Sequence, residues 1–245
     1  MKINKVHLLF EQSGTFKRAF LASGIPAFDY DILNDFGETD FIIDLFAEIE
    51  KAFNDEKSVF DTFTPDDLIF AFFPCVRFEN QTMLFFRGQA NQLQNQPLDK
   101  KMLYDIKLMD ELAELYKLVN KMFIVAIRRD LRLILENPYS KEHFLTRYWC
   151  LLPAIIDKDR RENGDFFAKP TQFFFLNCVP EQNVLFEPLP YNAITAQLFD
   201  QKDHWASLKR EDYEKTGATN RQTGRSMISP DYADRFIRQY IIDGG

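Results

Sequence analysis

The sequence is poor in the residues that stabilise small secreted or metal-dependent domains. It has only three cysteines, Cys75, Cys150 and Cys178, and this odd, widely spaced set does not form a disulfide framework. It also has only three histidines, and no His or Cys pair has the short spacing of a structural zinc site. We therefore expect a reducing compartment and no bound metal.

Membrane-spanning segments and an excess of basic residues are missing as well. The longest apolar runs, such as residues 122–127, are far shorter than the roughly 20 residues of a membrane helix. The N-terminal residues show no signal-peptide pattern. The formal net charge of −7 argues against a protein that coats nucleic acid through a broad basic surface. We expect a cytoplasmic protein whose contacts with nucleic acid, if it makes them, lie in a local cleft.

Phenylalanine is the residue present in unusual excess. The chain has 26 Phe among its 245 residues, and 46% of its residues are hydrophobic. A chain of this length and composition can bury a large core. We expect one large domain with an appended subregion.

Strand and helix patterns alternate through the first 140 residues. Apolar runs predict strands at residues 6–10, 27–31, 41–43, 68–72 and 131–135, and helical spacing predicts helices near 16–21 and at 45–53 and 103–127. Further along, a strand is expected at 173–176 and an amphipathic helix at 230–242, with loops at 79–100, 157–163 and 200–229. This alternation indicates βαβ units and a mostly parallel sheet.

The residues that could carry chemistry follow the predicted strands. They are Ser13-Gly14, Asp29 and Asp31, Asp44, Pro74-Cys75, and Glu136-Asn137-Pro138. In open α/β sheets, ligands bind outside the carboxyl ends of the strands. The sequence therefore predicts an active site at one edge of the sheet.

Four segments resemble, in order, the motifs of DNA cytosine-5 methyltransferases. Residues 9–16, Leu-Phe-Glu-Gln-Ser-Gly-Thr-Phe, resemble the Phe-x-Gly-x-Gly motif of the cofactor site, and residues 71–78 contain the Phe-Pro-Cys of the catalytic motif. Residues 135–138, Leu-Glu-Asn-Pro, are similar to the Glu-Asn-Val motif. Residues 225–230 and the helix after them resemble the closing motif, which packs beside the cofactor. The resemblance covers about residues 5–140 and resumes near 225.

The resemblance implies a Rossmann-like S-adenosylmethionine-dependent methyltransferase fold. Its central sheet would be mostly parallel and its C-terminal subregion reduced. Residues 1–178 would form the catalytic core, residues 179–224 a reduced target-recognition-like or irregular insert, and residues 225–245 a C-terminal helix returning to the core.

The resemblance also implies a covalent mechanism. Cys75 would add to C6 of cytosine, which makes C5 nucleophilic, while Glu136 would donate a proton to N3 if burial raises its pKa. The cytosine would be flipped out of duplex DNA or presented by a single strand.

The same resemblance assigns binding roles. S-adenosylmethionine would be bound by Phe10, Ser13, Gly14, Thr15, Asp31, Asp44, Phe73, Pro74 and Ser226. DNA would be bound by Arg77, Asn137, Arg160 and Arg161. Of the two acidic residues that end the second strand, we choose Asp31 over Asp29 for the ribose hydroxyls because Asp31 stands nearer the end of the strand.

The chain departs from the family pattern in three places. Gln12 and Thr15 replace two glycines of the cofactor turn. The family's Gln-x-Arg-x-Arg motif is reduced to Pro-Thr-Gln at 170–172, so Arg77, Arg160 or Arg161 would have to replace its arginines. The segment 180–224 is short for a target-recognition domain. We therefore expect minimal recognition, a partner subunit or a substrate other than ordinary duplex DNA, as in a short bacterial restriction-modification or phage enzyme.

Two alternatives remain open. Asn137-Pro138-Tyr139 resembles, with one proline fewer, the Asn-Pro-Pro-Tyr motif of enzymes that methylate adenine N6 or cytosine N4. That interpretation ranks second because it leaves Pro74-Cys75 unexplained. The other alternative is a catalytically silent relative that acts as a binding protein, which the altered glycine turn and the acidic charge motivate.

Overall fold

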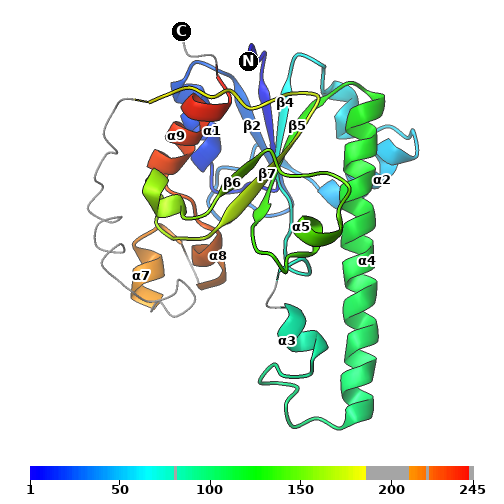
Figure 1. The fold of residues 1–245 in the computed structure, drawn as a ribbon. Helices are drawn as coiled ribbons and strands as arrows, with labels where there is room; N and C mark the ends of the chain where they lie inside the picture. The colour runs from blue at the N-terminus through cyan, green and yellow to red at the C-terminus, as the bar shows by residue number, and fades with distance from the viewer. Residues whose placement is uncertain (80–81, 186–209, 219–220, 243–245) are drawn as a thin grey trace.

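A seven-stranded sheet forms the middle layer of the protein (Figure 1). The computed structural model describes residues 1–79, 82–185, 210–218 and 221–242. The strands lie in the order β3-β2-β1-β4-β5-β7-β6. They are β1 (Val6–Leu9), β2 (Ala27–Asp31), β3 (Phe41–Ile42), β4 (Leu68–Phe72), β5 (Arg132–Pro138), β6 (Ile155–Asp157) and β7 (Thr171–Leu176).

The first five strands pair in parallel, and only β7 runs in the opposite direction. β1 pairs with β2 and β4, β2 with β3, and β4 with β5, all in parallel. β7 runs antiparallel to both of its neighbours, β5 and β6. This arrangement confirms the predicted α/β class with a mostly parallel sheet, and it is compatible with a Rossmann-like fold.

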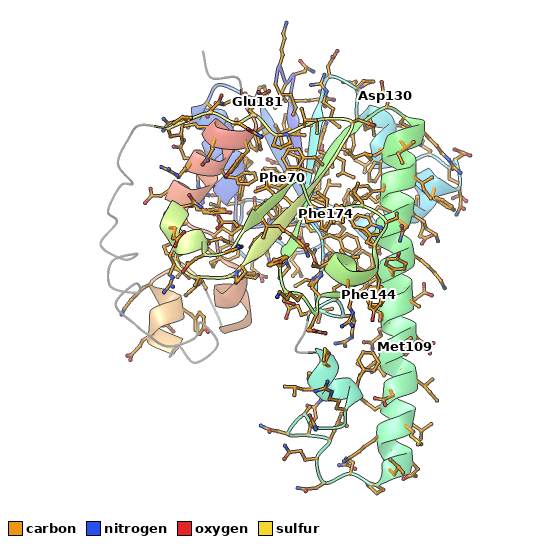
Figure 2. The ribbon with its side chains drawn as sticks, viewed as in Figure 1. Phe70, Met109, Asp130, Phe144, Phe174 and Glu181 are labelled. Carbon is orange, nitrogen blue, oxygen red and sulfur yellow. The ribbon has the colours of Figure 1, made fainter. Side chains whose placement is uncertain are left out.

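Helices cover both faces of the sheet (Figure 1). α1 (Thr15–Ala22) and α9 (Pro230–Tyr240) pack side by side on one face, and α2 (Leu45–Phe53) and α4 (Leu98–Arg128) pack on the other. Phe70 is buried toward α1 and α9, whereas Phe174 is buried toward α4 (Figure 2). The shorter helical elements are η1 (Val59–Thr62), α3 (Thr82–Phe86), α5 (Phe144–Tyr148), η2 (Arg160–Asn163), α7 (Arg210–Glu214) and α8 (Arg221–Ser226). Most of the phenylalanines therefore belong to two hydrophobic cores, one on each face of the sheet.

Where the pattern was strong, the predicted elements agree with the structure. The second strand and the helix at 45–53 have the predicted bounds, and the fourth strand does too. The fifth strand runs three residues further than predicted, through Pro138, because it pairs with β7 along its whole length. The C-terminal helix ends at Tyr240 and packs on α1, so this segment returns to the core.

Three predicted loops were wrong in part. Residues 79–100 include α3, which packs against an earlier start of α4 and stacks Phe85 on Tyr104 at 6.3 Å. The charged stretch 157–163 contains η2, and the last residue of β6 is Asp157. Residues 200–229 include α7 and α8, where Tyr213 packs on Phe167 with ring centres 6.0 Å apart. These elements are short and depend on distant contacts, so they leave no periodic pattern. Most of the predicted insert at 179–224 lies outside the described residues.

Much of the first half of α4 is exposed, although Leu108 is buried. This half extends past the carboxyl edge of the sheet, with α3 beside it (Figure 1). Leu103, Ile106 and Met109 are 59%, 61% and 54% exposed, although their spacing predicted the helix correctly. Met109 marks this free part of the helix (Figure 2). Of the described helices, none is both long and apolar enough to cross a bilayer.

Candidate functional site

A cavity of about 230 Å³ opens at the carboxyl ends of β1, β4 and β5. The loop between β1 and α1 forms one wall, the segment after β4 another, and residues 223–228 close it. Ten of the residues predicted for the site line this cavity: Phe10, Ser13, Thr15, Asp31, Phe73, Pro74, Cys75, Glu136, Arg160 and Ser226. The strand ends thus bring together segments that are far apart in the sequence.

The turn between β1 and α1 is shaped by Gly14. Its backbone is left-handed, with φ of 68°, and it occupies the N-cap position of α1. An L-residue rarely adopts this conformation, and an added Cβ would lie 2.8 Å from the Arg18 guanidinium. Gly14 itself does not line the cavity. It turns the chain so that Ser13 and Thr15, on either side of it, do.

Cys75 lies in the cavity wall three residues after β4. Its Sγ donates a hydrogen bond to Glu79 Oε1 at 2.8 Å. Burial raises the pKa of the thiol, Glu79 and Glu136 raise it further, and the positive charge of Lys169 opposes them. The raised pKa keeps Cys75 in the thiol form, with its S–H directed at the Glu79 side chain.

Glu136 faces the same cavity from β5, where it pairs in register with Phe72 of β4. Its side chain is buried, and burial raises its pKa while Lys169 and Arg160 lower it. The Arg160 Nη1 atom lies 4.0 Å from Glu136 Oε1. A carboxyl group whose pKa is raised by burial is the kind of group that acts as a general acid.

Arg160 is the only one of the three predicted substitute arginines that reaches the cavity. It is 1% exposed, forms an ion pair with Asp165, and lies 4.8 Å above the ring of Tyr232 in α9. Asp165 in turn accepts a hydrogen bond from Ser229 N at 2.7 Å. This chain of contacts ties the guanidinium beside Glu136 to the returning C-terminal helix.

The other two arginines are engaged elsewhere. Arg77 Nε donates to Glu111 of α4 at 2.5 Å, and Arg161 pairs with Asp159 at 2.6 Å. Neither side chain lines the cavity. Neither Arg77 nor Arg161 therefore replaces the missing motif arginines at the cavity.

Two further predicted residues lie beside the cavity and not in it. Asp44 caps α2, accepting from Phe46 N at 3.0 Å, and lines a separate hollow of about 710 Å³ that shares only Pro74 with the cavity. Asn137 is fully buried and donates to the carbonyl oxygens of Phe73 and Glu136 at 2.8 and 2.9 Å. Asn137 thus holds the segment of Cys75 against the end of β5.

Sequence reasoning missed three charged residues of the site. Glu79 follows Cys75 by four residues, a one-turn spacing that places the two side chains together. Lys169 precedes β7, whose antiparallel direction makes it begin at the edge where β5 ends. Glu11 lies inside the altered glycine motif and lines the cavity. Only the spacing of Glu79 could have been recognised in the sequence.

The described residues contain no group of three or more His, Cys, Asp or Glu side chains arranged to hold a metal ion. No protein-family model matches the sequence, and no curated protein is significantly similar to it. The function is therefore argued from the chemistry of the cavity.

Proposed function

We propose that this protein is an S-adenosylmethionine-dependent methyltransferase that transfers a methyl group to C5 of cytosine in DNA. The observation that carries the proposal is the shared cavity of Cys75 and Glu136. A thiol and a buried carboxyl group, from segments that follow β4 and end β5, face one hollow beside the turn of residues 10–15. Strand order β3-β2-β1-β4-β5-β7-β6 with an antiparallel β7 supports the Rossmann-like methyltransferase fold that the motifs imply.

The lining of the cavity fits the proposed cofactor. The Glu11 and Asp31 carboxyl groups offer acceptors for hydroxyl or ammonium groups, and the rings of Phe10, Phe36 and Phe73 offer apolar walls. S-adenosylmethionine, when bound, would supply the methyl group that cytosine C5 receives. Asp31 would hold the ribose hydroxyls, while Ser13 and Thr15 would approach the cofactor from the turn.

The cysteine and its neighbours would perform the covalent step. Cys75 Sγ would pass its proton to Glu79 and form a bond to cytosine C6. Glu136 would donate a proton to N3, so that formation of the Sγ–C6 bond displaces the C5=C6 π electrons and leaves an enamine whose C5 is nucleophilic. After C5 has gained the methyl group, it would lose its hydrogen as a proton and the Sγ–C6 bond would break. Lys169 and Arg160 provide positive charge beside these groups.

A trapping experiment tests this mechanism. An oligonucleotide containing 5-fluorocytosine keeps the adduct, because its C5 carries fluorine in place of the hydrogen that must leave as a proton. The wild-type protein should therefore form a covalent complex that resists denaturation. Methylation of unmethylated genomic DNA, read at base resolution, should appear at C5. Cys75→Ala should abolish both signals, whereas Cys150→Ala, at an exposed free thiol, should leave both unchanged. Methylation that survives Cys75→Ala would exclude the covalent route.

The amino-methylating alternative is less well supported. It requires the Asn137 side chain to bind an exocyclic amine, but Asn137 does not line the cavity. Mass spectrometry of nucleosides from treated DNA separates the two proposals. 5-Methylcytosine supports the Cys75 mechanism, and N6-methyladenine or N4-methylcytosine supports the alternative. No transfer and no trapping on any substrate would favour a silent binding protein.

A further inference from the structure

The part of α4 that extends past the sheet has apolar residues on two sides. We call residues 98–114 the arm (Figure 1). On one side of the arm, Phe85 of α3 stacks on Tyr104, and Leu108 is buried one turn further along. On another side, apolar residues at helical spacing form an exposed stripe, which consists of Leu98, Met102, Ile106 and Met109. The described chain therefore buries one apolar side of the arm and leaves the stripe in solvent.

The stripe is large for the surface of a monomer. Its four residues and Leu103 at its border are 54–67% exposed. Monomeric proteins rarely expose a contiguous apolar patch of more than a few hundred Å². Burying five side chains of this size in each of two copies would remove roughly 1,000 Å² from water, which is the size at which specific protein interfaces begin. The stripe is therefore large enough for a dimer that uses the same face twice.

The charge of the arm changes sign along its length. Residues 98–103 carry a formal charge of +1, from two lysines and one aspartate, and residues 109–114 carry −3, from one aspartate and two glutamates. Arg77 offsets one of these acidic charges through its ion pair with Glu111, and the acidic end stays negative. A second arm in the antiparallel direction brings each basic end against an acidic end, with Lys100 opposite Glu114. A parallel copy would bring the two acidic ends together.

The charges also argue against two other occupants of an exposed apolar helix. The whole arm has three lysines and five acidic residues, a formal charge of −2. Helices that lie in a membrane surface are rich in lysine and arginine on their polar face, which attracts anionic lipids. Surfaces that bind nucleic acid are basic for a similar reason. A second arm satisfies both the apolar stripe and the reversed charges.

We propose that two copies of this chain associate through their arms, antiparallel and side by side, with the stripes in contact and Ile106 near the two-fold axis. A single patch used twice is the usual form of a closed homodimer. The 17 residues of the arm span about 25 Å at 1.5 Å per residue, so the carboxyl edges of the two sheets would face each other across about this distance. The pairing does not depend on the reaction proposed for the cavity.

Sedimentation equilibrium of the full chain measures the association. The wild-type protein should exchange between monomer and dimer at micromolar concentrations. Ile106→Glu places a charge in the middle of the stripe and should weaken the association at least about tenfold. Ile127→Glu is the matched control, because it changes the same residue type in the same helix, at 58% exposure against 61%, but lies outside the arm. It should change the dissociation constant by less than about twofold, and circular dichroism should show that both variants keep their helix content.

A charge exchange tests the antiparallel direction. Lys100→Glu and Glu114→Lys each bring like charges together across the interface, and each should weaken the dimer about threefold. The two substitutions in one chain restore opposite charges in an antiparallel dimer, so the combined variant should bind nearly as tightly as the wild type. In a parallel dimer, residue 100 meets residue 100 of the other copy, and the combination would restore nothing.

Three results would overturn the proposal. A wild-type protein that stays monomeric at the highest soluble concentration does so without any variant, so misfolding of Ile106→Glu cannot obscure the answer. Equal weakening by Ile106→Glu and Ile127→Glu would place the contact outside the arm, and a combined variant no tighter than its single parents would exclude the antiparallel direction. A monomer that binds anionic lipid vesicles, and loses this binding in Ile106→Glu, would assign the stripe to a membrane surface instead. Methyl-transfer assays are independent of all these measurements.

Discussion

The two ends of the parallel strands differ in the hydrogen-bond partners of their buried polar side chains. At the amino ends, Asp67 accepts hydrogen bonds from Asn4 Nδ2 at 3.0 Å and Thr64 N at 2.9 Å, and His7 Nε2 lies 3.4 Å away. At the carboxyl ends, two buried carboxyl groups, Glu11 and Asp29, share a hydrogen bond with each other, and Lys17 Nζ lies 3.5 Å from Asp29 Oδ2. The amino ends therefore pair a carboxylate with several donors, whereas the carboxyl ends crowd carboxyl groups together, so that burial raises the pKa values of Glu11, Asp29 and Glu136.

This difference suggests a division of roles. Groups that are paired within the protein contribute to its stability, and removing one leaves its partners buried and unpaired. Carboxyl groups whose pKa values are raised by burial add little to stability at neutral pH and are typical of functional sites. Substitutions at the two ends should therefore separate loss of folding from loss of activity.

The largest effect is expected at the carboxyl end. Glu136→Gln removes the proton donor of the proposed reaction and should lower the rate of methyl transfer by about 10²- to 10⁴-fold. Its free energy of unfolding should change by less than about 1 kcal/mol, because glutamine fills the same volume and ends the cost of burying a carboxyl group whose pKa is raised. Single-turnover kinetics and urea unfolding measure the two quantities. A large loss of stability with normal kinetics in the folded fraction would contradict the division of roles.

At the amino end the expected effect falls on stability. Asp67→Ala leaves Asn4, His7 and Lys5 without their shared acceptor, and should lower the free energy of unfolding by about 3 kcal/mol. Affinity for S-adenosylhomocysteine should not change in the folded protein. Asp66→Ala, at a side chain that is 85% exposed, is the matched control and should stay within about 0.5 kcal/mol of the wild type in urea unfolding.

The smallest effect should be a change in pH dependence. Folding raises the pKa of Asp29 from its ordinary value near 3.8 to about 9, so the folded state holds a proton that the unfolded chain releases. This contribution to stability is complete below about pH 4 and is lost as the pH rises toward 9. Asp29→Asn should therefore flatten the decline of unfolding free energy between pH 6 and 8, by up to about 1.4 kcal/mol per pH unit. An unchanged slope would show that Asp29 is already ionised in the folded protein.

Part of the site could be predicted because parallel strands place their carboxyl ends at one edge. Cys75 and Glu136 each follow a strongly apolar strand, so their meeting depended only on β4 and β5 being neighbours. The choice of Asp31 over Asp29 followed from the same geometry, and Asp31 does line the cavity. Asp44 followed a strand of only two residues, and its carboxylate caps a helix beside a different hollow.

Periodic patterns and strand-end residues, which are local properties of the chain, were enough to predict an α/β protein and the edge of the sheet at which the cavity opens. Three-dimensional packing settled which charges face the cavity: it brought in Arg160 from η2, Lys169 from the start of β7 and Glu11 after the left-handed Phe10. It also directed Arg77 and Arg161 to other partners. Local patterns record hydrophobic spacing, whereas the partner of a charged side chain depends on distances between segments far apart in the sequence.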